Sequence, residues 1–173
     1  MTTNPNMNSY ENPGLSFLEE TLYNMPEAYA MLQGAPNHES IHGIVRFYPA
    51  GAGVIVNAEV YGLPSNTAPC APNIHGFHIH AGDSCTGNNT DPFANAGLHF
   101  NPSSCEHPEH AGDMPPLFSN NGFAWMLYYT EHFSIPEIIG KTIIVHEKPD
   151  DFHTQPSGDS GNKIACGVIN RSK

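Results

Sequence analysis

Alternation of hydrophobic and polar residues is the main pattern in the chain from about Ala28 onward. Between Val54 and Val60 every second residue is apolar, and polar residues occupy most of the positions between them. Successive side chains of a strand point to opposite faces, so this period of two predicts strands. The strands that the pattern defines are Ile41–Tyr48, Val54–Tyr61, Ile74–His80, Phe123–Thr130, Thr142–His146 and Ile164–Ile169. The turn at 49–53 joins the first two as a hairpin.

Two long segments, 81–122 and 147–163, show no sustained period and are rich in Pro, Gly and polar residues. Loops of this length inside a compact domain usually carry function. Ser134–Ile139 predicts one helical turn, because Pro136 stands near its start and Gly140 follows it. With about eight strands and no longer helix in its body, the chain is predicted to form an all-β sandwich or barrel.

Residues 1–27 are polar and irregular, and we predict that they form an N-terminal extension to a single domain at 28–173. The apolar residues of this extension recur near helical spacing; they are Leu15, Leu18, Leu22 and Met25. Ser16 and Glu19 have the spacing of a capping box, which favours a short helix that docks on the body or on a second subunit. A disordered tail is the alternative.

Charge limits the classes of partner. The chain has 17 acidic and 6 basic residues, a formal charge of −11, which disfavours nucleic acid and anionic membrane surfaces. Basic residues are concentrated in the last 33 positions, where an anionic substrate would be met: Lys141, Lys148, Lys163, Arg171 and Lys173. No apolar run is long enough to span a membrane, and no signal peptide is seen. A cytoplasmic location is therefore expected, although an extracytoplasmic one stays open.

Histidines are the most informative residues of the chain. Six of the 11 histidines fall between positions 75 and 110. His78 and His80 lie two residues apart in a predicted strand, so both imidazoles share the face opposite the core and can bind one metal ion. His75 falls on the core-facing side, where a buried, hydrogen-bonded histidine is expected. A chance pair on a surface strand is the alternative reading of His78 and His80.

A second group of donors lies in the first long loop. It comprises His99, His107, His110 and Asp113, and three imidazoles with one carboxylate form a tetrahedral zinc set. His146 ends an apolar strand beside the second loop, and alone it would be an ordinary polar residue at a strand end. An all-nitrogen set suits copper; the candidates for it are His78, His80, His99 and His146. His99 belongs to both sets because an imidazole has two ring nitrogens.

Five motifs occur in one order along the chain: GFHIH at 76–80, HFNP at 99–102, HAGD at 110–113, VHEKPDD at 145–151 and ACGVI at 165–169. In these motifs the chain resembles the copper–zinc superoxide dismutases over about residues 28–171. The resemblance implies an eight-stranded Greek-key β-barrel, or sandwich, with two long functional loops. It also implies an enzyme with copper and zinc as cofactors that converts superoxide to molecular oxygen and hydrogen peroxide.

The resemblance also implies roles for individual residues. The copper ligands would be His78, His80, His99 and His146, and the zinc ligands His99, His107, His110 and Asp113. His99 would bridge the two ions and carry a proton in catalysis. Asp150 would hydrogen-bond a copper ligand and a zinc ligand together. Cys85 and Cys166 would form the intrasubunit disulfide of the family.

The chain departs from the family pattern at several positions. Lys163 aligns with the rim arginine that guides superoxide; lysine keeps the charge but loses the two-pronged donor. The spacing from His107 to His110 is short, and we interpret it as bacterial-like. Cys70 and Cys105 have no counterpart, and a second disulfide between them stays open.

Two other functions remain alternatives at this stage. The first is a non-catalytic, zinc-binding relative of the dismutases, which the complete four-histidine copper set disfavours. The second is a copper carrier, which usually needs a close pair of thiolates that this chain lacks. The family contains monomers and dimers, so a homodimer also stays open.

Overall fold

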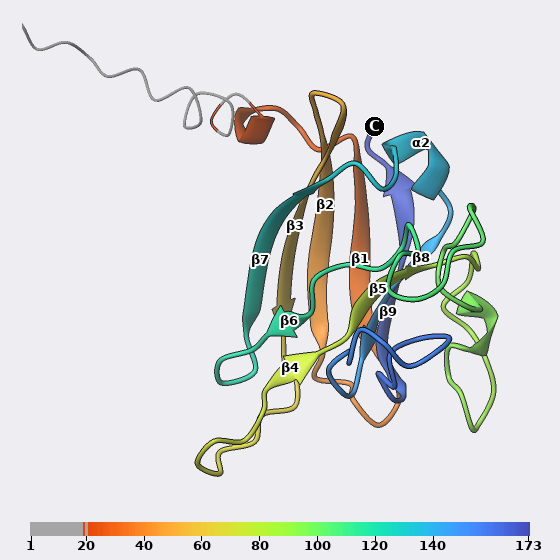
Figure 1. Ribbon diagram of the computed structural model, residues 1–173. Coiled ribbons are helices and arrows are strands. Elements are labelled where there is room, and N and C mark those ends of the chain that lie inside the picture. Colours follow the sequence, from red (N-terminus) through yellow and green to blue (C-terminus); the bar gives the residue numbers. More distant parts are fainter. Residues whose placement is uncertain (1–18, 20) are drawn as a thin grey trace, which may run out of the picture.

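The structure is a computed structural model that describes residue 19 and residues 21–173 (Figure 1). In these residues seven strands form one antiparallel sheet in the order β5-β8-β9-β1-β2-β3-β7, and a two-stranded sheet pairs β4 with β6. The strands are β1 (Ala28–Gly34), β2 (His42–Ala50), β3 (Gly53–Tyr61), β4 (Ile74–His75), β5 (Phe77–His80), β6 (Leu117–Phe118), β7 (Ala124–Thr130), β8 (Thr142–His146) and β9 (Lys163–Arg171). The short helices are η1 (Ala94–Ala96) and α2 (Ile135–Ile138).

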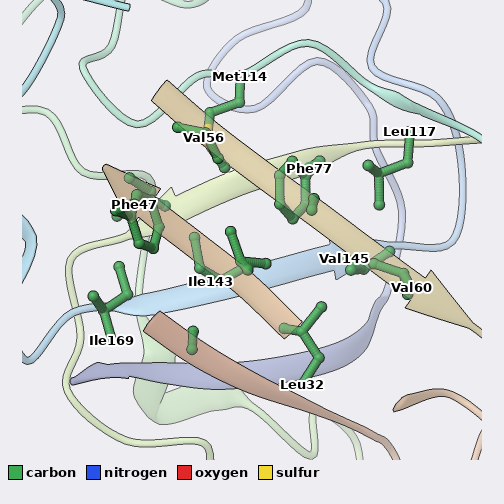
Figure 2. Packing of buried hydrophobic residues seen from close by; sticks show 14 of the residues in the cluster. Leu32, Phe47, Val56, Val60, Phe77, Met114, Leu117, Ile143, Val145 and Ile169 are labelled. Atoms are coloured by element: carbon green, nitrogen blue, oxygen red, sulfur yellow. The ribbon is translucent and has the colours of Figure 1, made fainter. Parts of the chain in front are cut away.

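The large sheet curls into a half-barrel, and its inner face forms the core. Phe47 of β2, Phe77 of β5 and Ile143 of β8 are fully buried in one cluster, although their strands lie in different parts of the sheet (Figure 2). Burial of each of these side chains stabilises the fold by about 1.5–3 kcal/mol, because apolar surface is removed from water. The predicted all-β barrel or sandwich is therefore confirmed.

Two predicted elements differ in detail from the structure. The period-two pattern expected from about Ala28 proves to be a full strand, β1, which lies between β2 and β9. The predicted strand Ile74–His80 is divided at Gly76, whose N–H donates to Lys148 O while its carbonyl accepts from His146 N–H. The division sets β5 alone against β8, and β5 carries two of the predicted metal ligands.

The helical predictions are partly tested. The turn predicted at 134–139 is α2, and Ser134 and Glu137 form a capping box at its start. Residues 21–23 of the N-terminal extension are helical, and Leu22 and Met25 are exposed. Leu15, Ser16 and Leu18 lie outside the described residues. Among the described residues, no helix has the length and apolar character that crossing a membrane requires.

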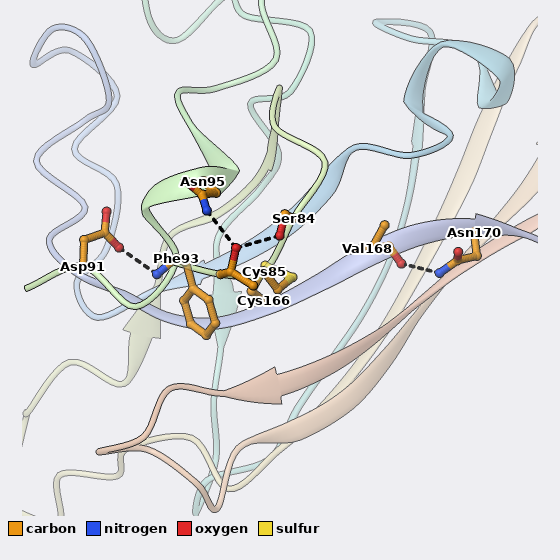
Figure 3. Close-up of a disulfide and its surroundings, with 9 residues drawn as sticks. Ser84, Cys85, Asp91, Phe93, Asn95, Cys166, Val168 and Asn170 are labelled. Atoms are coloured by element: carbon orange, nitrogen blue, oxygen red, sulfur yellow. Dashed lines mark hydrogen bonds between the residues drawn. A yellow bond between two sulfur atoms is a disulfide. The ribbon is translucent and has the colours of Figure 1, made fainter. Parts of the chain in front are cut away.

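The disulfide implied by the resemblance is present. Cys85, in the loop after β5, is bonded to Cys166 of β9, across a sequence separation of 81 residues (Figure 3). The bond fastens the first long loop to the sheet. Cys70 and Cys105 are exposed free thiols in the described part of the chain, so they do not form a second bridge with each other.

Candidate metal centre

Strand β5 places His78 and His80 on the same face, two residues apart. As expected, this face lies opposite the one on which Phe77 and Ile79 enter the core. Both imidazoles are nevertheless buried, because segments of the first long loop pair with the strand. The backbone of His78 forms an isolated β-bridge with Asp113, and that of His80 forms one with His99. The loop thereby encloses the two rings beside β5.

Four histidines converge beside this strand. One ring nitrogen of each lies within 4.8 Å of the others, in what we call the four-histidine cluster: His78, His80, His99 and His146. His80 Nδ1 donates to the Gly97 carbonyl (2.9 Å) and His146 Nδ1 to the Gly161 carbonyl (3.3 Å). In a neutral ring the other nitrogen then carries a lone pair. The two Nε2 atoms lie 3.2 Å apart, so two lone pairs face each other. A cation between them removes that repulsion.

Burial keeps His80 and His146 in the neutral form that binds metals. It lowers the pKa of His80 well below its usual value, with a further contribution from nearby His146. Burial, followed by the proximity of His78, lowers the pKa of His146 to about 3. A ring that does not hold a second proton near pH 7 keeps its lone pair available for a metal ion.

A second group, the His–Asp cluster, shares His99 with the first: His99, His107, His110 and Asp113. His99 Nδ1 lies 2.7 Å from Asp113 Oδ1, and the Nδ1 atoms of His107 and His110 lie 3.0 and 3.3 Å from its Oδ2. Burial alone would raise the pKa of Asp113, but the hydrogen bond from His99 and the adjacent rings lower it. Asp113 is therefore held as a carboxylate amid three imidazoles.

Orphaned nitrogens test whether these clusters fit metal ions. Five buried ring nitrogens have no hydrogen-bond partner among the described residues: His75 Nε2, His78 Nδ1, His99 Nε2, His107 Nδ1 and His110 Nδ1. A buried polar atom without a partner costs about 1–3 kcal/mol. Four of these five rings belong to the two clusters, where metal coordination would satisfy their nitrogens. Nitrogen donors alone suit copper, and three nitrogens with one carboxylate suit zinc.

Asp150 joins the two clusters. Its Oδ2 accepts from His78 Nε2 at 2.8 Å, and its Oδ1 accepts from His107 Nε2 at 2.9 Å. Burial would raise the pKa of Asp150, but the hydrogen bonds from His78, from the Phe152 N–H and from His107 lower it to about 2. The carboxylate fixes which nitrogen of each ring is protonated and leaves Nδ1 free for a metal.

Comparison with known proteins agrees with this geometry. Residues 41–169 match the model of the family described as copper/zinc superoxide dismutase. The chain belongs to this family. It is 32% identical over 161 residues to superoxide dismutase [Cu-Zn] A of Xenopus laevis, covering 84% of this chain and 97% of the relative. It is 29% identical over 147 residues to superoxide dismutase [Cu-Zn] of Deinococcus radiodurans, covering 75% and 77%. A vertebrate and a bacterial relative both match, and the bacterial-like reading stays a prediction.

Two glycines that sequence analysis did not single out allow the loops of this dismutase to close. A Cβ on Gly112 would lie 2.3 Å from Ile79 O, so only glycine lets the first loop reach β5. Gly158 has φ +67°, and a Cβ there would lie 1.9 Å from Asp150 Oδ1. The second loop therefore packs directly over the carboxylate that joins the clusters.

Contacts between the loops complete the dismutase centre. Gln155 of the second loop donates to the His107 carbonyl (2.7 Å) and accepts from the His107 N–H (3.0 Å). Gly112 is visible in the HAGD motif, whereas Gln155 left no signal because its partner is a backbone group 48 residues away. His75 is buried with Nδ1 3.2 Å from His146 O and lies outside both clusters, as expected.

A cavity of about 750 Å³ opens beside the four-histidine cluster of the dismutase. His80, His99 and His146 line it, and so does Lys163, the residue predicted to meet the anionic substrate. Lys163 Nζ lies 2.6 Å from the carboxylate of Asp91, a residue of the first loop that sequence analysis did not select. The cavity therefore brings the predicted metal ligands and the predicted cation to one solvent-accessible space.

Proposed function

We propose that this protein is a superoxide dismutase that converts superoxide to molecular oxygen and hydrogen peroxide at a histidine-bridged copper–zinc centre. The observation that carries the proposal is the position of His99, whose ring belongs to both donor clusters. His78, His80 and His146 would hold copper with it, and His107, His110 and Asp113 would hold zinc. Family membership supports the same activity, because the relatives bear that name.

The residues of the chain have separable roles in this function. Copper bound by the four-histidine cluster would supply one-electron chemistry, alternately accepting an electron from superoxide and giving one to it. Hydrogen bonds to the backbone hold two rings of that cluster in place, because the Gly97 and Gly161 carbonyls orient His80 and His146. Such orientation preserves the geometry around the reacting atom.

Protons are needed for the second product. We assign their transfer to His99 Nε2, which is buried without a hydrogen-bond partner among the described residues. His99 also lines the cavity, so a proton held at this atom can reach a bound substrate. Nδ1 of the same ring faces Asp113 at 2.7 Å, which fixes the orientation of the ring.

Lys163 is the candidate for attracting the substrate. It is a cationic side chain on a cavity wall that also contains His80 and His146. The chain carries a formal charge of −11, so attraction of superoxide must come from a local positive field rather than from the whole molecule. Lys163 would supply part of that field, together with the bound metal ions.

Metal analysis combined with a superoxide assay tests the proposal. We expect one copper and one zinc per chain and activity that is lost in His99→Ala. His132→Ala, which changes a histidine outside both clusters, serves as the control and should retain activity. Zinc alone after copper loading, without dismutation, would instead support the non-catalytic zinc-binding alternative. A homodimer and a cytoplasmic location remain predictions, which sizing in solution and localisation of the tagged protein would test.

A further inference from the structure

An ion pair lines the cavity beside the four-histidine cluster. Lys163, the first residue of β9, places Nζ 2.6 Å from Asp91 Oδ2, and Asp91 lies in the first long loop, which also contains Cys85. The Lys163 side chain is 15% exposed and that of Asp91 is 37% exposed. Both residues line the cavity. The cation predicted to meet the substrate is therefore already engaged by a carboxylate of the same chain.

The structure holds Asp91 in place for this contact. Its Oδ1 accepts from the Phe93 N–H at 3.0 Å (Figure 3). Its backbone carbonyl accepts from the Asn88 N–H at 2.9 Å. The disulfide fastens the same loop to β9 at Cys166, three residues beyond Lys163. The loop and the strand that carry the two charged residues are therefore both held in place. The Lys163–Asp91 pair is also shorter and less exposed than the surface pair of Lys148 with Asp159, at 3.6 Å.

The charges around the cavity make this contact consequential. Among the described residues that line it, the carboxylates are Asp91 and Glu147, and Lys163 is the single lysine or arginine. An anion that enters must share the Lys163 ammonium with Asp91 or displace it. Charges a few ångströms apart in a partly buried cavity are screened much less than charges on an open surface.

We propose that Asp91 is a positioning residue that sets the anion affinity of the site by competing with the incoming anion for Lys163. This inference rests on the proposed function and assigns to the first loop a part in substrate capture beyond its metal ligands. Asp91 touches neither metal cluster, and it acts through Lys163. The carboxylate thus weakens anion capture while it holds the ammonium at the cavity wall.

The test is a titration of the copper- and zinc-loaded protein with azide, a small anion whose binding to Cu(II) changes the visible absorption. Asp91→Asn removes the charge but keeps an oxygen for the Phe93 N–H. We expect it to bind azide about three- to tenfold more tightly than the unaltered protein. Asp83→Asn is the matched control, because it changes the net charge equally in the same loop without lining the cavity. It should leave the affinity unchanged.

A double-variant cycle separates competition from other effects. In a Lys163→Gln background, Asp91→Asn should change azide affinity by less than twofold, because no ammonium remains to be released. Asp91→Glu, which restores the charge, should return the affinity toward that of the unaltered protein. A role limited to ordering the loop would instead lower the affinity in Asp91→Asn, with or without Lys163.

The outcomes are distinguishable from failure of the proposed function. Unchanged or weaker azide binding by copper-loaded Asp91→Asn overturns the inference and leaves the dismutase proposal standing. An equal gain in azide affinity from Asp91→Asn in the Lys163→Gln background also overturns the inference. The gain would then come from the general electrostatic field of Asp91 and not from competition for Lys163. Failure of the unaltered protein to load copper overturns both proposals.

Discussion

Asp150 shows how much one buried carboxylate determines in this protein. It accepts one hydrogen bond from a ring of each metal cluster, so it sets the protonated nitrogen of His78 and of His107. An asparagine at this position offers one acceptor oxygen and one donor amide. One of the two ring N–H groups would then face a donor, and the ring would lose its fixed orientation.

We predict that Asp150→Asn lowers metal retention about 10- to 100-fold, the usual effect of removing a residue that orients metal ligands. Competition with a chromophoric chelator measures this directly. Asp151→Asn is the control, because Asp151 accepts hydrogen bonds from Thr154 and the His153 N–H and contacts no cluster residue. Equal retention in Asp150→Asn and Asp151→Asn would contradict the role assigned to Asp150.

Lys163 is the second residue whose charge is expected to matter. We predict that Lys163→Glu depresses the bimolecular rate with superoxide at least about tenfold, because it replaces an attracting charge with a repelling one. Pulse radiolysis or stopped-flow mixing measures the rate. Lys148→Glu makes the same change of charge at a lysine that does not line the cavity, and it should reduce the rate far less. Comparable rates in the two variants would count against Lys163.

Individual ligands could be predicted because their chemistry is visible in the sequence. His78 and His80 are two residues apart in a strand, and that spacing alone puts both rings on one face. The partners that orient the rings could not be predicted in the same way. Gly97 and Gly161 contribute carbonyl oxygens, and every residue has one, so only the path of the backbone selects them.

At the scale of elements, the structure depends on loops that close tightly over short strands. The second long loop reaches the centre at Gly158, which has φ +67° and a hydrogen atom where any other residue would place Cβ against Asp150. The loop thus closes over the link between the clusters only because this residue lacks a side chain. The loop lies against both Asp150 and His107 at this glycine, and both residues are buried.

We predict that Gly158→Ala displaces the loop and speeds metal loss to a chelator by about tenfold or more. Gly51→Ala is the matched control, since Gly51 also has positive φ (+59°) but has open space where Cβ would stand. Both variants carry the backbone penalty of about 1 kcal/mol for a left-handed conformation. Metal loss at the same rate from both would show that contact with Asp150 is unimportant.

Strand bounds were predicted most closely where one face is clearly apolar, whereas the place of a strand in the sheet could not be predicted from local pattern. Strand β3 alternates from Val56 to Val60 and was predicted with nearly its observed bounds, Gly53–Tyr61. Strand β1 contains Ala28 and Ala30, which are fully buried but give a weak hydrophobic signal in sequence. Its central place in the sheet comes from pairing with β2 and β9, which no local pattern encodes.

At the scale of the whole molecule, the net charge opposes the substrate that the site is proposed to take. A formal charge of −11 repels superoxide at long range, whereas Lys163 and bound metals attract it within the cavity. The Debye length is about 10 Å at 0.1 M ionic strength, so added salt screens both effects. The sign of the salt dependence therefore reports which one governs encounter.

We predict that the bimolecular rate falls as salt is added, because the local field near the cluster acts at the point of capture. The measurement is the rate constant with superoxide at several concentrations of an inert salt. Lys163→Gln should flatten the dependence, and Lys148→Gln should leave it nearly as steep. A rate that rises with salt in the unaltered protein would mean that the overall negative charge dominates.

The arrangement of the whole molecule was predictable mainly through the family resemblance. Five ordered motifs implied a barrel with two functional loops, and the structure has a curled sheet with those loops joined by Asp150, Gln155 and the Lys163–Asp91 pair. The Cys85–Cys166 bond was predicted in the same way. The pairing of Asp91 with Lys163 could not be predicted from the resemblance, because it depends on how a 42-residue loop folds back on β9.

The shared ring of His99 has a thermodynamic consequence. Either ion, once bound, would order that imidazole for the other, so the entropy of fixing it is lost only once. By linkage, zinc must then change the affinity for copper by the same factor as copper changes the affinity for zinc. Calorimetric titrations in the two orders of addition should consequently sum to one total free energy, with the second ion binding more tightly than it does to the apoprotein.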